Sequence, residues 1–252
     1  MSKIKERARV ISQEMLIKDI YSMWIETAIA KEALPGQFIS VYTKSQARLL
    51  PRPISICETD ENALRIVYRI AGEGTGEFSS YKEGDSINIM GPLGNGFPLE
   101  EGSAILIGGG IGIPPMLELA KQLKGDKTIV VGYRDSDTFL YEDLKKYGKV
   151  VIATDDGSIG TKGNVIDAIK EQGAKGSVIY ACGPTPMLKG VKAYAEKKGI
   201  RAYISMEERM ACGVGACLGC VCKSSDIDDH SKVRNKRICK DGPVFNAADI
   251  EL

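Results

Sequence analysis

Residues 104–116 read AILIGGGIGIPPM, an apolar run followed by a glycine-rich segment and two prolines. A short apolar run predicts a buried β-strand, and Pro114 or Pro115 suits the first turn of a helix. Glycines between a strand and a helix let a dinucleotide approach the backbone, although the spacing is not G-x-G-x-x-G. Simple turn chemistry is the alternative. The candidate nucleotide residues here are Gly108, Gly109, Gly110 and Gly112.

Downstream of this stretch, apolar segments alternate with amphipathic ones. Strands are expected at 103–109, 128–133, 149–155 and 177–183, and helices at 113–123, 138–147, 164–172 and 186–198. Strands that are apolar throughout and separated by helices indicate a parallel sheet covered on both faces. Ligands bind such sheets at the carboxyl ends of the strands, where the turn ACGP places Cys182 and Gly183 beside an expected nicotinamide. A lone buried cysteine is the other interpretation.

The first hundred residues have a different pattern of apolar and turn-forming residues. Short segments rich in β-branched and aromatic residues, separated by turn formers, predict strands at 8–16, 20–30, 37–43, 53–58, 63–71 and 85–91. We expect a small antiparallel barrel. The fold class is therefore a β barrel plus α/β, with the barrel at 1–100, a nucleotide-binding domain at 101–207 and a small cysteine-rich domain at 208–252.

The barrel carries two weak signals for a flavin. In RPISI, the Arg52 guanidinium suits a diphosphate, Pro53 fixes the strand entry and Ser55 suits the polar edge of a flavin ring. A surface arginine before a strand is the alternative. In VYRIAGEGTGEF, a strand containing Tyr68 and Arg69 leads into glycines before a short helix, which predicts an anion site or a plain turn.

The strongest signal is ERMACGVGACLGCVCK, residues 208–223. It places Cys212, Cys217 and Cys220 in the order C-x4-C-x2-C, with Cys239 following in RICKDG. This order is known from plant-type 2Fe-2S clusters, whereas structural zinc sites usually pair two C-x2-C knuckles. We interpret these four cysteines as cluster ligands, with zinc as the alternative, and Cys222 as a small buried hydrophobe.

Composition narrows the classes of function. Lys and Arg (34) balance Asp and Glu (33), so no field suited to nucleic acid or an anionic membrane is expected. No stretch has the roughly 18 apolar residues of a membrane span, and the first sixteen lack the apolar core of a signal peptide, so a cytoplasmic protein is expected. His230, the one histidine, is interpreted as a solvated loop residue, which leaves the chemistry to bound cofactors.

Together, R-P-x-S in a barrel, GGGIG and C-G-P resemble the ferredoxin reductase-like flavoproteins over essentially the whole chain. With the cysteine-rich segment and KDGPVF added, the chain resembles the electron-transfer subunits of NAD-dependent type B dihydroorotate dehydrogenases, of pyrimidine biosynthesis. The resemblance implies an oxidoreductase subunit with FAD in the barrel at 1–100, NAD in the domain at 101–207 and a 2Fe-2S cluster in the domain at 208–252. It also implies a partner subunit that holds FMN and oxidises dihydroorotate, in a heterotetramer of two subunits of each kind.

The resemblance also implies roles for individual residues. The FAD residues would be Arg52, Pro53, Ile54, Ser55, Val67, Tyr68, Arg69, Gly74 and Thr75, and the cluster ligands Cys212, Cys217, Cys220 and Cys239. No side chain is expected to act as a catalytic acid or base. The choice of NAD over NADP follows from the resemblance, because Arg134 and Asp135 after a strand argue in opposite directions.

Two alternatives remain at this stage. The first is the small subunit of a sulfide dehydrogenase or of an NADH-dependent ferredoxin:NADP oxidoreductase. All four expected ligand positions are cysteine here, whereas a carboxylate is expected among the ligands in those relatives. The second, from another class, is a zinc-stabilised nucleotide-binding regulator without redox activity.

Overall fold

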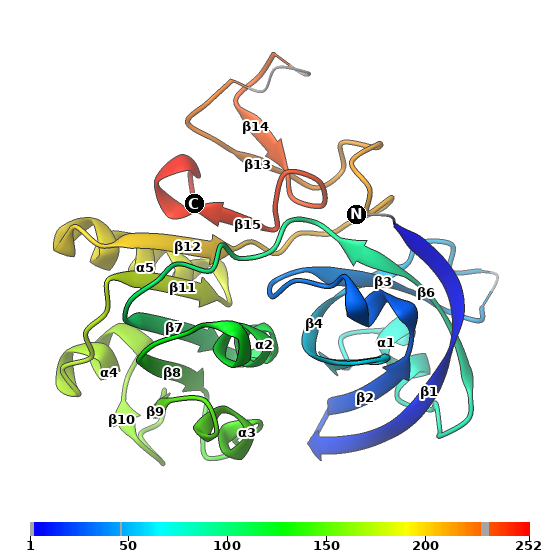
Figure 1. The fold of residues 1–252 in the computed structure, drawn as a ribbon, viewed down its shortest axis with the longest axis horizontal. Helices are drawn as coiled ribbons and strands as arrows, with labels where there is room; N and C mark the ends of the chain where they lie inside the picture. Colours follow the sequence, from blue (N-terminus) through cyan, green and yellow to red (C-terminus); the bar gives the residue numbers. More distant parts are fainter. Residues whose placement is uncertain (1–2, 46, 228–231) are drawn as a thin grey trace.

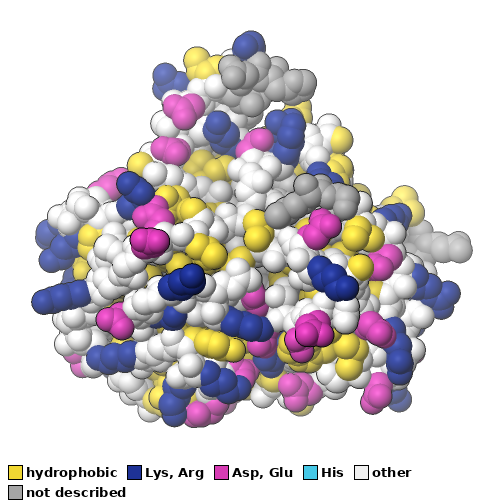
Figure 2. Space-filling model, viewed as in Figure 1, with side chains coloured by type: hydrophobic (Ala, Val, Ile, Leu, Met, Phe, Trp, Pro, Cys, Tyr) yellow, Lys and Arg dark blue, Asp and Glu magenta, His cyan; other side chains and the backbone are white. Residues whose placement is uncertain are grey.

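The computed structural model describes residues 3–45, 47–227 and 232–252. A barrel and an open sheet lie side by side, and the C-terminal segment lies across the end where they meet (Figure 1). His230 falls outside the described residues. No helix in the described ranges is long and apolar enough to cross a membrane. Positive and negative side chains are interspersed over the face shown in Figure 2.

The barrel is closed by six antiparallel strands in the order β1-β2-β5-β4-β3-β6. They are β1 (Ile4–Ile17), β2 (Ile20–Glu26), β3 (Phe38–Tyr42), β4 (Arg52–Asp60), β5 (Ala63–Arg69) and β6 (Ser86–Leu93). Alternate residues point inward, so that Met23, Ile25, Ile39, Ile66 and Ile89 are fully buried. The predicted antiparallel barrel is confirmed.

One predicted strand is shorter than expected. The apolar pattern extends from residue 20 to residue 30, but β2 ends at Glu26 and a 3-10 helix, η1 (Ala28–Lys31), follows. The Thr27 hydroxyl accepts a hydrogen bond from the backbone N–H of Ile29 at 3.1 Å, which caps that helix. The cap turns the chain while Ile29 remains buried. Helix α1 (Glu73–Phe78) lies later, between β5 and β6.

The second unit is a seven-stranded sheet in the order β10-β9-β8-β7-β11-β12-β15. Its strands are β7 (Ala104–Gly109), β8 (Lys127–Tyr133), β9 (Lys149–Thr154), β10 (Thr161–Lys162), β11 (Val178–Cys182), β12 (Arg201–Ser205) and β15 (Val244–Asn246). Its helices are η2 (Gly110–Gly112), α2 (Pro114–Gln122), α3 (Tyr141–Lys145), α4 (Val165–Glu171) and α5 (Thr185–Lys198). All strands but β15 run parallel.

Two separate cores explain why these strands are apolar throughout. Ile105 and Ile107 pack with residues of α4 and α5, while Leu106 and Ile129 pack with residues of α2 and α3. Alternate residues of one strand are thus buried on opposite faces of the sheet. The predicted parallel sheet with helices on both faces is confirmed.

The C-terminal segment contains a small hairpin, β13 (Val221–Lys223) with β14 (Asn235–Arg237), and a 3-10 helix, η3 (Ala247–Asp249). Between them, strand β15 pairs antiparallel with β12, with Ile204 opposite Phe245. The chain beyond residue 207 therefore returns to complete the sheet of the second unit. The residue boundaries of the three domains remain predictions. The pairing of β15 with β12, which links the C-terminal segment to the second unit, was not predicted from the sequence.

Candidate functional site

Arg52, the first residue of β4, lies directly on the first turn of helix α1. A Cβ atom on Gly74 would fall 2.5 Å from the Arg52 Nε, so only glycine allows this contact. The guanidinium donates to the carbonyl of Leu50. No carboxylate in the described ranges lies within 4 Å of it. A cation without an acidic partner beside a helix start, whose first N–H groups lack partners within the helix, fits an anionic ligand.

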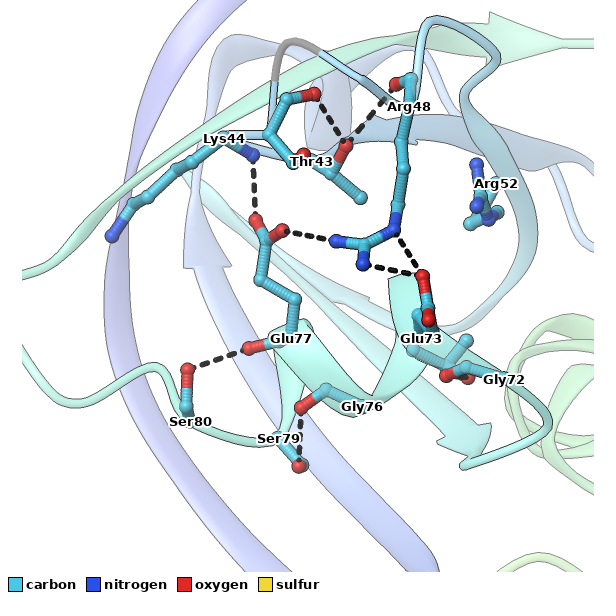
Figure 3. Close-up of polar contacts among 12 residues, drawn as sticks. Thr43, Lys44, Arg48, Arg52, Gly72, Glu73, Gly76, Glu77, Ser79 and Ser80 are labelled. Atoms are coloured by element: carbon cyan, nitrogen blue, oxygen red, sulfur yellow. Dashed lines mark hydrogen bonds and ion pairs between the residues drawn. The ribbon is translucent and has the colours of Figure 1, made fainter.

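The acidic side chains of α1 are held by a different arginine. Arg48 donates from Nε to Glu73 Oε2 at 2.9 Å, and its Nη1 lies 3.7 Å from Glu77 Oε2. Glu77 Oε1 also accepts the backbone N–H of Lys44 at 2.6 Å. Figure 3 shows Arg48 between the two glutamates, with Arg52 to one side. The carboxylates nearest to the Arg52 position are thus already neutralised.

The remaining predicted flavin residues flank a place where two strands diverge. Residues 52–55 of β4 pair with β3, and residues 67–69 of β5 pair with β2. The ladder between β4 and β5 ends at Ile56 and Ile66. The backbone groups along the facing edges of 52–55 and 67–69 therefore belong to no described ladder. Such edges offer the donors and acceptors that the polar edge of a flavin needs.

The side chains of these residues differ in exposure. Pro53, Ile54 and Ser55 are half-buried, whereas Val67 and Tyr68 are buried and Arg69 is exposed. The Tyr68 hydroxyl donates to Gln13 Oε1 at 2.8 Å, and burial raises its pKa. The Thr75 hydroxyl accepts the N–H of Ala71 at 2.8 Å and so stabilises its own turn. Val67, Tyr68 and Thr75 therefore offer a ligand mainly their backbone.

The glycine loop and the C-G-P turn meet at one edge of the sheet. Gly108 at the end of β7 lies opposite Cys182 at the end of β11. A Cβ atom on Gly112 would fall 2.3 Å from the Cys182 carbonyl oxygen, and one on Gly109 or Gly183 would fall 2.5 Å from Met187. The predicted nicotinamide residues are thus brought together, including Gly110, whose φ is +52°. Gly108, Gly109, Gly112 and Gly183 are thus required by close packing of these segments, and the open space beside Gly110 is where the backbone is accessible to a dinucleotide.

The thiol of Cys182 stays protonated near neutral pH. Burial raises its pKa to about 12, and a hydrogen bond with Ser205 on the adjacent strand β12 opposes this only in part. A neutral thiol is a weak nucleophile. It can therefore pack beside a ring without reacting with it.

Cys212, Cys217 and Cys220 lie in one loop before β13, Cys239 lies in the turn after β14, and backbone N–H groups donate to the sulfurs of all of these but Cys217 among the bonds described. Gly215 N–H donates to Cys239 Sγ at 3.1 Å, and Ala216 N–H donates to Cys212 Sγ at 3.3 Å. Cys239 N–H donates to Cys220 Sγ at 3.4 Å. Donors of this kind stabilise thiolates and are the usual surroundings of iron–sulfur clusters.

Local conformation supports the same assignment, whereas the pKa values of the cysteine thiols shift in opposite directions. Gly213 and Gly215 have φ of +68° and +87°, values that glycine adopts without strain. Burial opposes ionisation of Cys212, but hydrogen bonds from Val214, Cys217 and Ala216 lower its pKa to about 6, whereas burial and the neighbouring Cys220 raise the pKa of Cys239 to about 12. In the described ranges, no three His, Cys, Asp or Glu side chains gather at the position of a single metal ion.

The Cys222 thiol makes its hydrogen bond within the hairpin of β13 and β14. Its Sγ donates to the carbonyl of Lys236 across the hairpin, at 3.7 Å. Burial raises its pKa to about 11, and it packs against the sheet core. This placement supports its interpretation as a small hydrophobic residue.

The loop that contains Cys212, Cys217 and Cys220, here called the cysteine loop, packs against the barrel. A Cβ atom on Gly213 would fall 3.0 Å from Ser40 Oγ, on strand β3. Asn95, just after β6, donates its backbone N–H to the carbonyl of Gly242 at 2.6 Å and its side-chain amide to that of Asp241 at 3.0 Å. The C-terminal loop is thus fixed to the unit that carries Arg52.

Comparison with known proteins identifies the family. Residues 207–251 match the iron-sulfur cluster binding domain of dihydroorotate dehydrogenase B, and residues 106–193 match an oxidoreductase NAD-binding domain. A protein of Fusobacterium nucleatum named dihydroorotate dehydrogenase B (NAD(+)), electron transfer subunit, is 44% identical, covering 98% of both chains. A protein of Geobacillus sp. strain WCH70 with the same name is 43% identical, covering 98% of this chain and 99% of its own. The chain belongs to this family of electron transfer subunits.

A solved structure of an NADH-dependent reduced ferredoxin-NADP oxidoreductase, described for flavin-based electron bifurcation, shares the whole architecture. It aligns with a TM-score of 0.87 at 29% identity, covering 98% of this chain and 90% of its own. The family of electron transfer subunits and this oxidoreductase thus have one fold in common. The curated relatives, at higher identity, favour the dihydroorotate dehydrogenase B family over the first alternative considered above.

The predicted family and fold class are confirmed by these comparisons. The iron–sulfur and NAD-binding family matches, with the flavin reductase fold, also support the predicted set of FAD, a 2Fe-2S cluster and NAD. The individual residues that hold each group remain predictions. The observations that fit them are the lack of an acidic partner for Arg52 among the described residues, the open backbone at Gly110 and the N–H groups that donate to cysteine sulfurs.

Sequence reasoning missed two features of the site. Arg48 neutralises the acids of α1, and its signal was the i, i+4 spacing of Glu73 and Glu77 on a short helix. The contact of Gly213 with Ser40 had no signal, because it joins segments far apart in the sequence.

Proposed function

We propose that this chain carries electrons from a catalytic partner subunit, through a 2Fe-2S cluster and FAD, to NAD. The partner is an FMN-containing subunit that oxidises dihydroorotate for pyrimidine biosynthesis, and the complex is a cytoplasmic heterotetramer of two subunits of each kind. The relatives' shared name, as electron transfer subunits of dihydroorotate dehydrogenase B, supports the class of partner.

The single observation that carries the proposal is the seating of the cysteine loop on the barrel, where Gly213 meets Ser40. Residues 52 and 53 of β4 pair with residues 40 and 41 of β3. The loop proposed to hold the cluster therefore lies one strand away from the segment proposed to hold FAD. Electron tunnelling needs cofactors close together, and the contact of Gly213 with Ser40 supports the proposed order of cluster and FAD.

Each group has its own holding residues in the proposal. Arg52 and the backbone at Gly74 and Thr75 bind the FAD diphosphate, and the facing edges of 52–55 and 67–69 bind the flavin. Gly108, Gly109, Gly110 and Gly112, with Cys182 and Gly183, bind NAD. Cys212, Cys217, Cys220 and Cys239 bind the cluster.

When bound, the flavin exchanges electrons singly or in pairs, and so links a one-electron cluster to two-electron hydride transfer. The residues of the chain need to bind, orient and insulate these groups without moving protons themselves. The protonated Cys182 thiol at the edge of the sheet agrees with that role.

The experiment assays each subunit alone and then mixed, following orotate formation with NAD as the only acceptor. This chain alone should reduce artificial dyes with NADH but should form no orotate. Adding the FMN-containing subunit should create NAD-dependent orotate formation. Orotate formed by this chain alone would disprove the division of labour. An inactive mixture at full cofactor loading would transfer the assignment to the related reductases.

A further inference from the structure

Strand β4 connects the two cofactor-binding regions of the chain. It begins at Arg52, in the proposed FAD site, and near its end Thr59 contacts Glu118. Glu118 belongs to α2, the helix that begins directly after the glycine loop. One strand therefore contacts both the flavin segment and the helix that carries the nicotinamide segment.

The contact is made by a buried carboxylate. Glu118 is 1% exposed, and it is a charged residue among the buried apolar residues of its helix. Its Oε2 accepts the backbone N–H of Thr59 at 2.7 Å, and its Oε1 accepts the Thr59 hydroxyl at 3.0 Å. Gln122, one turn later, donates to Oε1 at 2.6 Å.

A buried carboxylate is costly unless its oxygens are fully hydrogen-bonded. In the described part of the chain, no Lys or Arg nitrogen lies within 4 Å of Glu118, so three neutral donors must hold it. An apolar residue would fill the helix face at lower cost but would leave the N–H of Thr59 without this acceptor. The directional bonds therefore specify how α2 sits on β4.

The same helix also binds the other polar group of the Thr59 backbone. Lys121 Nζ donates to the Thr59 carbonyl at 2.7 Å and lies 3.6 Å from Glu58 Oε1. Both backbone groups of one residue are thus bound by side chains one turn apart on α2. Rotation or sliding of the helix along the strand would break both bonds together.

We propose that Thr59 and Glu118 are positioning residues for hydride transfer. Their contact fixes the glycine loop, through α2, relative to the flavin segment, through β4. The inference rests on the proposed function, in which a hydride carrying two electrons passes between FAD and the nicotinamide of NAD. Hydride transfer is sensitive to distance, since a misplacement of about 1 Å can cost about a hundredfold in rate.

The test compares Thr59→Val with Thr59→Ser, both loaded with FAD and cluster. Valine keeps the shape and the backbone N–H but removes the hydroxyl, whereas serine keeps both donors. Glu118→Gln is the second variant, because the amide can still accept the Thr59 N–H but only if the Thr59 hydroxyl and the Gln122 amide both reverse to accept its NH2 group. Anaerobic mixing with saturating NADH measures the rate of flavin bleaching, and the long-wavelength charge-transfer absorption reports nicotinamide stacking on flavin.

The Thr59→Val and Glu118→Gln variants should retain FAD and cluster but reduce flavin about tenfold more slowly, with weaker charge-transfer absorption. Thr59→Ser should match the unaltered protein. Asn164→Ala is the control for stability alone, because it removes the N-cap of α4, away from this contact. Unaltered rates in both variants would overturn the inference, as would an equal slowing in Asn164→Ala.

A separate measurement keeps the two proposals apart. Arg52→Ala tests the FAD site itself, and full flavin retention in that variant would count against the proposed function. If Arg52→Ala loses FAD while Thr59→Val transfers hydride at the unaltered rate, the FAD assignment stands and the positioning role is wrong. If Glu118→Gln fails to fold, the pair Thr59→Val and Thr59→Ser still decides the question.

Discussion

Arg52 rests on Gly74, with the Arg52 Nε 2.5 Å from the position that a Cβ atom of residue 74 would occupy. The two residues come from different elements of the barrel domain, strand β4 and helix α1. The absence of one methyl group thus permits the cation to lie on the helix. The first two predictions depend on this contact.

Gly74→Ala should push the guanidinium off the helix and weaken FAD retention. Gly76→Ala is the matched control, because a Cβ atom there meets nothing within 4 Å. Both changes add a methyl group to the same short helix, and alanine favours helix at either position. Flavin content after gel filtration measures the outcome. Equal retention in the two variants would show that Arg52 is not displaced or does not bind FAD.

Arg52→Ala should weaken FAD binding by about 1.5 to 3 kcal/mol, the usual range for hydrogen bonds to charged groups, or about 10- to 150-fold in Kd. Arg48→Ala removes the same charge from the same segment, but Arg48 is already paired with Glu73 and Glu77. Its effect should be smaller, because exposed ion pairs contribute up to about 1 kcal/mol. Fluorescence titration with FAD compares the two, and an equal loss would argue against a direct diphosphate contact.

Cys222→Ser should retain the iron–sulfur cluster. The Cys222 thiol is used across the hairpin, where it donates to Lys236, and its pKa is raised to about 11 by burial. Serine can make the same hydrogen bond. The EPR signal of the reduced protein should therefore match that of the unaltered chain. A cluster lost in Cys222→Ser and kept in Cys220→Ser would reverse the ligand assignment.

Glu100→Gln should destabilise the fold more at pH 7 than in acid. The pKa of Glu100 is lowered by hydrogen bonds from Tyr203 at 2.6 Å and Arg201 at 2.7 Å. Because the folded-state pKa lies below the unfolded value of about 4.3, the stabilisation is present above that value and is lost as pH falls through the lowered pKa. Denaturant titrations at pH 7 and pH 3.5 measure the difference, with Glu101→Gln as an exposed control. A difference that is the same at both pH values would contradict the linkage.

Local patterns in the sequence predicted most of the fold. Residues such as Ile105 and Leu106 are buried on opposite faces of the sheet, and burial on both faces produces the continuous apolar runs that were read as parallel strands. Strand β15 was not predicted, because three residues are too few to show a period. Its partner, β12, lies some forty residues earlier, so no local signal exists for the pairing.

The candidate site likewise combines local motifs, which the sequence shows, with contacts between distant residues, which it does not show. The cysteine spacing and the glycine loop are local features, and the structure joins Cys239 to Cys220 by a hydrogen bond and brings the glycine loop to the C-G-P turn. The contacts between Arg52 and Gly74, and between Thr59 and Glu118, join separate elements. A sequence gives the types of these residues but not their partners. Tyr68 is a predicted FAD residue whose burial was not evident from the sequence, because its side chain lies in the barrel core and leaves mainly its backbone available to a ligand.

The most direct test of the electron path compares Cys217→Ser with the unaltered chain, each loaded with FAD and mixed with the FMN-containing catalytic subunit. NADH-dependent dye reduction reports the flavin and nicotinamide sites, and orotate formation with NAD as the only acceptor reports the whole path. The account predicts that Cys217→Ser lacks the cluster EPR signal, keeps its FAD and dye reduction, and forms no orotate. Orotate formation at the unaltered rate by a chain without a cluster would contradict it.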